Sequence, residues 1–281
     1  MFKLIKAKGL TKEELQAIKE LEIECSSSEK LNMKLNWDML ENRPKDQIND
    51  FLYYDNDKLI GFLGMYGFSL NPKEMEVTGM VHPQYRRKGI FKELMLEAKK
   101  QCKKGTAKRF LLITERRSNS GIGFAQAIGS KYSYSEYRMK FNEANIPNVE
   151  SKGVSLRKAS IKDKKEIAEL DREFLNLPED NNDDNELRTT YMAELEGNTI
   201  GKIGTTMDGV DGYIFGVGIK REYRRQGYGR IVLSLTLEKL LKDNINSIIL
   251  EVASENDNAL GLYKSCGFKE NTVYDYYELD V

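Results

Sequence analysis

The chain is an internal duplication. Residues of the first half recur in the second half at one fixed offset of 138 positions: Arg86 as Arg224, Gly89 as Gly227, Leu112 as Leu250 and Gly129 as Gly267. Because this register needs no gap, each copy is expected to form the same supersecondary unit. Strand and helix patterns interleave within each copy, which predicts α/β domains with a mixed sheet. We place these two domains at residues 1–145 and 146–281.

The apolar periodicity of each copy predicts its elements. In the first copy, strands are expected over Phe2–Ala7, Phe51–Tyr54, Leu59–Tyr66, Met75–Val81, Phe110–Thr114 and Tyr132–Phe141. Helices are expected after the Thr11/Glu14 capping box, over Leu31–Asn42, up to about Lys103 and over Gly123–Ile128. The second copy starts again with Val154–Lys158, Lys162–Phe174 and a hairpin over Tyr191–Thr205.

Charge and cysteine usage exclude several classes of protein. The 281 residues carry 44 basic and 44 acidic side chains, so there is none of the basic excess of a nucleic-acid binder. Three cysteines without CxxC spacing indicate neither a disulfide framework nor a zinc site. His82 is the sole histidine, and its place before Pro83 predicts a surface loop rather than a catalytic base.

We expect neither a signal peptide nor a membrane-spanning segment. Met1–Leu10 contains no apolar run of a signal peptide, and no stretch is long enough to span a membrane. We therefore expect a cytoplasmic protein without a membrane partner.

A glycine-containing basic loop follows a strand in the second copy. Arg224 and Arg225 precede Gly227 and Gly229, and a helical pattern follows. Amides in a first helical turn lack intrahelical partners and can hold a phosphate. The spacing is that of neither a Walker loop nor a dinucleotide fingerprint. The alternative is a loop that only reverses the chain.

A second group of residues lies at a fixed distance beyond this loop: Leu250, Glu251, Val252, Asn256, Ala259, Tyr263, Gly267 and Phe268. Together with Arg-x-x-Gly-x-Gly, this pattern resembles the GNAT superfamily of N-acetyltransferases over about the last 70 residues. The duplication is similar to that of tandem, two-domain GNAT proteins.

The resemblance implies acetyl-CoA as co-substrate and no metal. The residues that it implies for the pyrophosphate are Arg224, Arg225, Gln226, Gly227, Tyr228 and Gly229. The strand Val217, Gly218 and Ile219 would pair with the pantetheine arm and offer an amide to the thioester carbonyl. Asn256 would contact the pantetheine, cap the last helix, or do both.

Two side chains are candidates for proton transfer. Glu251 is the predicted base and Tyr263 the predicted acid for the departing thiolate, a pairing that resembles the bacterial ribosomal-protein alanine acetyltransferases. The alternatives are a solvent-facing Glu251 and a core-packed Tyr263.

The first copy lacks these side chains. The offset places Ile113 at the position of Glu251, Ala125 at that of Tyr263, Ser118 at that of Asn256 and Phe91 at that of Gly229. We predict that the second copy is catalytic and that the first is a degenerate scaffold or substrate wall. The alternative is that the first copy still binds CoA in a weakened pocket that Phe91 crowds.

The sequence thus predicts an acetyl-CoA-dependent N-acetyltransferase that acts on a primary amine of a small molecule or peptide. The alternative is a non-catalytic acyl-CoA-binding sensor or assembly module. With either function, the protein is expected to be a monomer or a homodimer. The acceptor would be set by Asp163–Arg188, where the acidic run Glu179–Glu186 is expected to attract a cationic amine.

Overall fold

The chain forms two compact units. The computed structural model describes residues 1–68, 72–141, 149–175, 184–208, 211–243, 245 and 247–280. The first unit contains residues 1–135 and 272–281, and the second contains residues 136–271. The boundary expected between residues 145 and 146 lies outside the described residues, so it stays a proposal.

The first unit is a mixed sheet between helices. Its elements are β1 (Phe2–Lys8), α1 (Lys12–Glu29), α2 (Trp37–Glu41), β2 (Ile48–Asp55), β3 (Lys58–Tyr66), β4 (Glu74–Val81), α3 (Ile90–Cys102), β5 (Arg109–Glu115), α4 (Asn119–Ala127) and the start of β6 (Lys131–Phe141). The strand order is β1-β2-β3-β4-β5-β12, where β12 is Phe268–Leu279. Only the β4–β5 pair among these is parallel.

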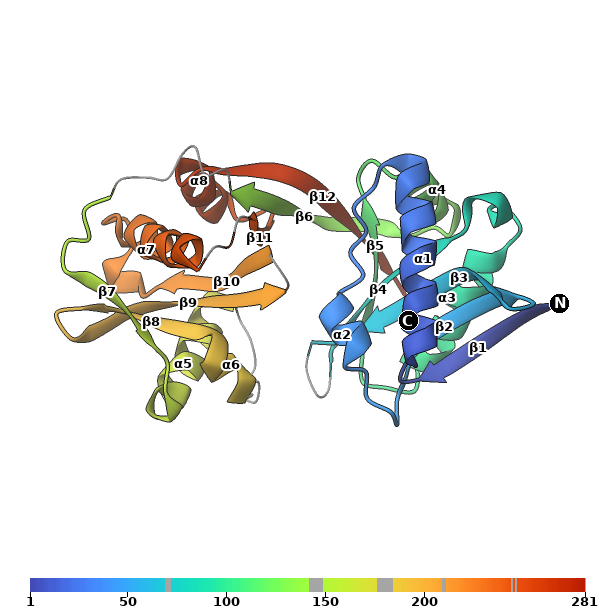
Figure 1. Cartoon of the computed structure of the whole chain (residues 1–281), viewed down its shortest axis with the longest axis horizontal. Coiled ribbons are helices and arrows are strands. Elements are labelled where there is room, and N and C mark those ends of the chain that lie inside the picture. The colour runs from blue at the N-terminus through green and yellow to red at the C-terminus, as the bar shows by residue number, and fades with distance from the viewer. Residues whose placement is uncertain are drawn as a thin grey trace. The chain divides into compact units, whose positions relative to one another are not determined.

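Apolar faces fix the helices of this unit on opposite sides of the sheet. α1 buries Ile18 and Leu21 against β2 and β3, and it lies across one face in Figure 1. α3 buries Leu94 and Ala98 on the other face. The predicted Thr11 capping box is confirmed, since the Thr11 hydroxyl accepts from the Glu14 N–H at 3.1 Å.

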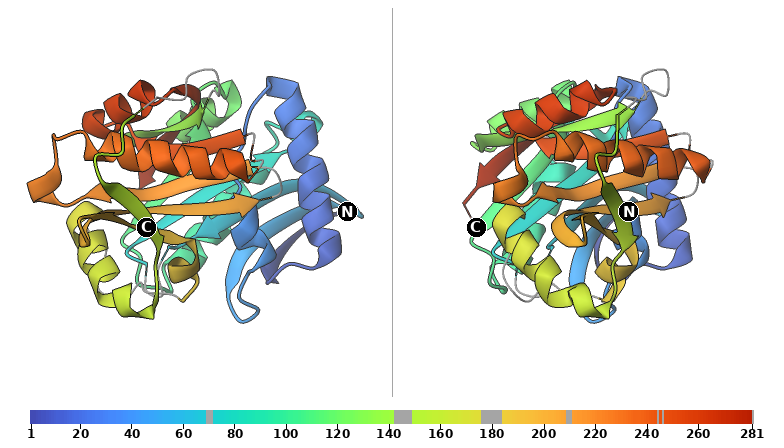
Figure 2. Two further views of the ribbon diagram at one scale, coloured as in Figure 1. Left: turned by 60° about the vertical axis from the view of Figure 1, so that its left-hand side comes forward. Right: turned by 90° about the vertical axis from the view of Figure 1, so that its left-hand side faces the viewer.

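The second unit repeats this plan. Its elements are β7 (Val154–Lys158), α5 (Lys164–Leu175), α6 (Asp184–Thr189), β8 (Thr190–Leu195), β9 (Asn198–Asp208), β10 (Asp211–Ile219), α7 (Tyr228–Lys242), β11 (Ser247–Ala253) and α8 (Asp257–Ser265). The order is β6-β11-β10-β9-β8-β7, with β10 and β11 parallel. Figure 2 shows α7 (orange) and α5 (yellow-green) on opposite faces of this sheet. The fold class predicted from the sequence is therefore confirmed.

The last strand of each copy pairs with the sheet of the other copy. β12 runs antiparallel to β5, with Tyr276 opposite Ile113. β6, predicted as the final strand of the first copy, runs antiparallel to β11, with Arg138 opposite Glu251. Each sheet is thus completed by a strand from the other half of the sequence.

The predicted helix over Leu31–Asn42 is wrong in its first half. Only Trp37–Glu41 is helical, because Lys30 takes a left-handed φ of 55° that ends α1. The backbone groups that follow bind elsewhere. The Asn32 N–H donates to Glu115 at 2.5 Å, and the Leu35 carbonyl accepts from the Tyr66 hydroxyl at 2.5 Å.

Replacing Tyr276 by alanine should destabilise the first unit by about 3–5 kcal/mol, because the cavity left in a core does not collapse fully. Tyr276 is fully buried, its ring stacks on Tyr134 at 4.4 Å, and its hydroxyl accepts from Lys34 at 2.7 Å. Urea unfolding measures the loss.

The matched control is Tyr132→Ala, since Tyr132 is 56% exposed. It should cost less than about 1 kcal/mol. Equal losses in the two variants would show that β12 does not contribute to the core of the first unit.

Candidate active site

The turn into α7 has the conformation of an anion-binding cradle. Arg225 and Gly227 take left-handed φ angles of 63° and 89°. α7 starts at Tyr228, and in the described part of the chain no side chain caps its first turn. A Cβ at Gly227 would meet nothing within 4 Å, so the glycine is required by its φ and not by crowding. The first main-chain N–H groups of α7 can therefore hold an anion.

The first copy has the same turn. Arg87 and Gly89 take φ angles of 65° and 83°, and α3 starts at Ile90, again with no side-chain cap among the described residues. The cradle is thus duplicated together with the sequence.

A β-bulge interrupts β10 beside this cradle. Phe215 pairs with Gly204 of β9, whereas Gly218 pairs with Lys202, so three steps on β10 match two on β9. Gly216 lies within the bulge at a φ of 55°. A bulge takes backbone groups out of the ladder and turns the strand.

β10 also parts from β11 at this level. Their parallel register ends at Ile214 opposite Leu250. The β11-facing edge of Val217–Ile219 therefore lies beyond the paired segment, where a ligand's amide groups can add to it. The α5-facing side of this segment is covered, because a Cβ at Gly218 would lie 1.8 Å from the ring of Phe174.

The polar side chains of the loop form hydrogen bonds with other parts of the protein. Arg224 donates from Nε to the Ile219 carbonyl at 2.7 Å and pairs with Glu173. Arg225 donates to the Asn258 side chain at 2.8 Å, and Gln226 donates to a backbone carbonyl at 2.9 Å. All three had been assigned to the cofactor from the sequence.

Tyr263 is a core residue of the second unit. It is 7% exposed and packs edge-on against Phe268, with ring centroids 6.1 Å apart. Burial, with a smaller contribution from Cys266, raises the pKa of Tyr263 to about 12. The phenol therefore keeps its proton throughout the physiological range.

The structure places an arginine beside Glu251 that the sequence did not indicate. Arg138 stands opposite it on β6 and donates from Nε to Glu251 Oε1 at 2.9 Å. The alternation around 131–141 predicts a strand but not its partner, so no local signal places this arginine at the site.

The two candidate proton carriers lie on opposite faces of the sheet. Leu250 and Val252 belong to the core cluster that contains Tyr263, and Val217 and Ile219 pack against that cluster. Successive strand residues alternate in direction, so Glu251 points to the other face. The sheet therefore lies between the two side chains.

Asn256 caps α8. Its side chain accepts from the Ala259 N–H at 3.1 Å, which confirms the predicted N-cap. Ser118 caps α4 in the same way by accepting from the Gly121 N–H.

A pocket of about 970 Å³ lies in the first unit. β4 and β5 part after Val77 and Leu112, and the pocket is lined by Thr78–Val81 and Leu112–Glu115. It extends to the loop at Arg86–Gly89 and to α3 and α4. The first copy therefore combines the cradle with a cavity between the parting strands.

This pocket is lined by apolar residues where the second copy has reactive ones. Ile113 lines it at the position of Glu251, and the neighbouring Ala125 is buried at the position of Tyr263. Phe91 lines it as expected, but its ring packs edge-on against Phe124 with centroids 4.8 Å apart. Phe91 thus narrows the pocket without filling it.

Two further expectations from the sequence concern His82 and the acidic run Glu179–Glu186. His82 lies in the predicted loop after β4, but its side chain is buried at 6% accessibility, with Nε2 2.8 Å from a carboxylate oxygen of Glu24. The acidic run Glu179–Glu186 lies outside the residues whose side chains are described. Among the residues that the structure describes, no cluster of His, Cys, Asp or Glu could hold a metal.

Comparison with known proteins identifies the family. The sequence model of the acetyltransferase (GNAT) family matches residues 15–129 and, separately, residues 156–268. The chain belongs to the GNAT family. The predicted tandem arrangement is confirmed by these two matches.

Curated GNAT relatives cover part of the chain. The [ribosomal protein bS18]-alanine N-acetyltransferase of Escherichia coli is 37% identical over 60 residues, which span 21% of this chain and 40% of that protein. An N-alpha-acetyltransferase of Sulfurisphaera tokodaii is 29% identical over 104 residues, or 62% of its length.

Solved structures share the whole fold. A GCN5-related N-acetyltransferase from Sphaerobacter thermophilus has a TM-score of 0.80 at 15% identity, covering 99% of this chain and 95% of that one. A tandem GNAT protein of the clavulanic acid biosynthesis pathway has a TM-score of 0.74 at 15% identity, covering 100% and 98%. Among the described residues, no helix combines the length and apolarity that a membrane span requires.

The raised pKa of Tyr263 should appear in the pH dependence of stability. The folded pKa of about 12 exceeds the ordinary value of about 10, so the contribution is complete below pH 10 and is lost as the pH rises toward 12. Between pH 9 and pH 11, the wild type should lose about 1.4 kcal/mol more unfolding free energy than Tyr263→Phe. Urea unfolding at both pH values measures it, and equal losses would contradict the burial of the hydroxyl.

Proposed function

We propose that the second copy is an acetyl-CoA-dependent N-acetyltransferase acting on a primary amine of a small molecule or a peptide. The observation that carries this proposal is the opening between β10 and β11, with the cradle beyond the end of β10 and Glu251 and Tyr263 on opposite faces of the sheet. Acyl transfer requires a proton acceptor for the amine, a donor to the oxyanion and a donor to the leaving group. Membership of the GNAT family supports the same reaction.

Glu251 is the proposed base. An amine with a pKa of ~10.4 costs about 4.6 kcal/mol to deprotonate at pH 7, so an acceptor for its proton is needed. The hydrogen bond from Arg138 fixes the direction of the Glu251 carboxylate on the face that Phe174 and α5 also cover. The amine would therefore approach from this face.

Tyr263 is the proposed hydrogen-bond donor to the leaving sulfur. Full transfer from a phenol with a pKa of about 12 to a thiolate whose conjugate acid lies near ~8.5 is uphill by about 5 kcal/mol. A hydrogen bond that stabilises the thiolate avoids that cost. A backbone N–H of Val217 or Gly218 would donate to the carbonyl oxygen of the thioester.

The Tyr263→Phe variant should lower kcat by about 100-fold, because it removes one transition-state donor. The Kd for acetyl-CoA should not change, since the loop and the strand are intact. Thiol release from acetyl-CoA, with a panel of amino acids, diamines and short peptides, measures kcat.

Tyr223→Phe is the matched control, as it removes a hydroxyl from a tyrosine that packs beside the loop against Tyr228. It should retain activity. Full activity of Tyr263→Phe would rule out its role.

A second candidate function concerns the first copy: acyl-CoA binding without transfer, as a sensor or assembly module. The pocket beside the duplicated cradle favours it, because that copy has space for a ligand while Ile113 and Ala125 replace both proton carriers.

Calorimetry with acetyl-CoA should find two binding equivalents. Valine at Gly89 or Gly227 is strained by the positive φ and should remove one site each. Gly89→Val should keep the transferase activity, and Gly227→Val should abolish it. Loss of activity in Gly89→Val would instead make the first copy the catalytic one.

A further inference from the structure

The first arginine of each loop reaches back along its own strand. Arg86 donates from Nε to the carbonyl of Val81 at 3.1 Å, and Arg224 donates from Nε to the carbonyl of Ile219 at 2.7 Å. Val81 and Ile219 are the last residues of β4 and β10. Both arginines thus close the same ring between the loop and the strand that precedes it.

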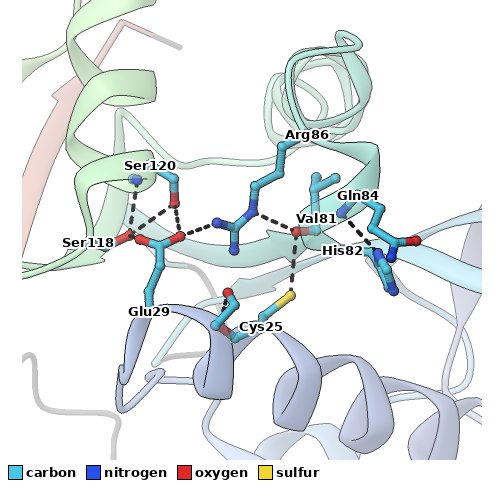
Figure 3. Close-up of polar contacts among 10 residues, drawn as sticks. Cys25, Glu29, Val81, His82, Gln84, Arg86, Ser118 and Ser120 are labelled. Atoms are coloured by element: carbon cyan, nitrogen blue, oxygen red, sulfur yellow. Dashed lines mark hydrogen bonds and ion pairs between the residues drawn. The ribbon is translucent and has the colours of Figure 1, made fainter.

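The far side of each guanidinium meets a carboxylate of the first helix. Arg86 forms an ion pair with Glu29, the last residue of α1, as Figure 3 shows. Arg224 pairs with Glu173 near the end of α5 at 2.6 Å. The two copies therefore share a link from strand end to arginine to first helix, although these helices differ in length.

In the first copy the link includes a third element. Glu29 accepts from the hydroxyls of Ser120 at 2.8 Å and Ser118 at 3.3 Å, at the start of α4 (Figure 3). Burial raises the pKa of Glu29, but the hydrogen bond from Ser120 and the charge of Arg86 outweigh it and lower the pKa overall. The carboxylate is therefore ionised at neutral pH, which strengthens the pair.

We propose that Arg86 and Arg224 are positioning residues, which fasten the cradle to the first helix of their copy, rather than ligands of the phosphates. This rests on the proposed function, in which the cradles hold the diphosphate of CoA. Each guanidinium already uses N–H donors on a carbonyl and a carboxylate, so its direction is fixed and its charge is balanced within the protein. The main-chain N–H groups at the start of α3 and α7 have no such partners in the first helical turn and can hold the diphosphate themselves.

The link in the second copy also contacts the face of the sheet from which the amine would approach. The Arg224 guanidinium lies 5.6 Å from the ring centroid of Phe174, which is next to Glu173 and covers Gly218. Releasing Arg224 should therefore loosen the end of α5 where Phe174 covers the strand. Loss of the link should raise the KM for the amine as well as the Kd for acetyl-CoA.

A positioning role and a ligand role predict opposite effects of removing the carboxylate. In a Gly89→Val background, which leaves the second site to titrate, we compare Arg224→Gln, Glu173→Gln and the double variant by calorimetry with acetyl-CoA at several salt concentrations. A positioning role predicts that each single variant weakens binding about 3–10-fold, that the double variant is no weaker than either, and that the salt dependence of Kd is unchanged.

A ligand role predicts the reverse. Glu173→Gln would then bind as the wild type does or more tightly, because it frees the guanidinium, and Arg224→Gln alone would weaken binding and reduce the salt dependence. That result would overturn the proposal. Arg221→Gln, a neutralised arginine just before the loop, is the matched control and should leave Kd unchanged.

Hydrogen exchange separates this proposal from the proposed function. Without any ligand, Arg224→Gln and Glu173→Gln should both speed the exchange of the amides of Arg230 and Ile231, which donate to the Gly227 carbonyl of the loop, and Arg221→Gln should not. Failure of the wild type to bind acetyl-CoA, with this exchange pattern intact, would contradict the proposed function alone. Unchanged exchange in both variants would contradict the positioning role.

Discussion

The parting of two parallel strands is the constraint on which the rest of the site depends. β10 follows β11 only as far as Ile214 and Leu250, whereas its pairing with β9 is interrupted by the bulge at Gly216 and resumes at Gly218. Unpaired backbone groups inside a sheet are costly unless a ligand or water satisfies them. In the proposed function this opening is the edge that binds the cofactor, with Glu251 on one face of the sheet and Tyr263 on the other.

The two copies keep the same framework and differ in chemistry. Both have the left-handed loop residues, the helix cap and the link from loop arginine to first helix. Only the second has Glu251 and Tyr263, whereas the first has a pocket lined by Ile113. The exchanged strands make the copies interdependent, because Arg138 is encoded in the first half and orients Glu251 of the second.

Much of the fold could be predicted because its signals are local. The Thr11 capping box and the strand periodicities need only neighbouring residues, and they were confirmed. The helix expected at Leu31–Asn42 failed because its backbone groups bind Glu115 and Tyr66, which lie far away in the sequence. The loop predicted at His82 is present, but the His82 side chain contacts Glu24 of α1, a partner that no local pattern indicates.

The sequence by itself determined the duplication, the two mixed α/β domains, the loops with Gly89 and Gly227, and the cap at Asn256. These features depend on spacing and on backbone conformation, which a few adjacent residues specify. Only the tertiary structure decided which strand completes each sheet and that Arg224 turns to Ile219 and Glu173. A strand's partner and the direction of a long charged side chain depend on distant groups, and no local pattern encodes their positions.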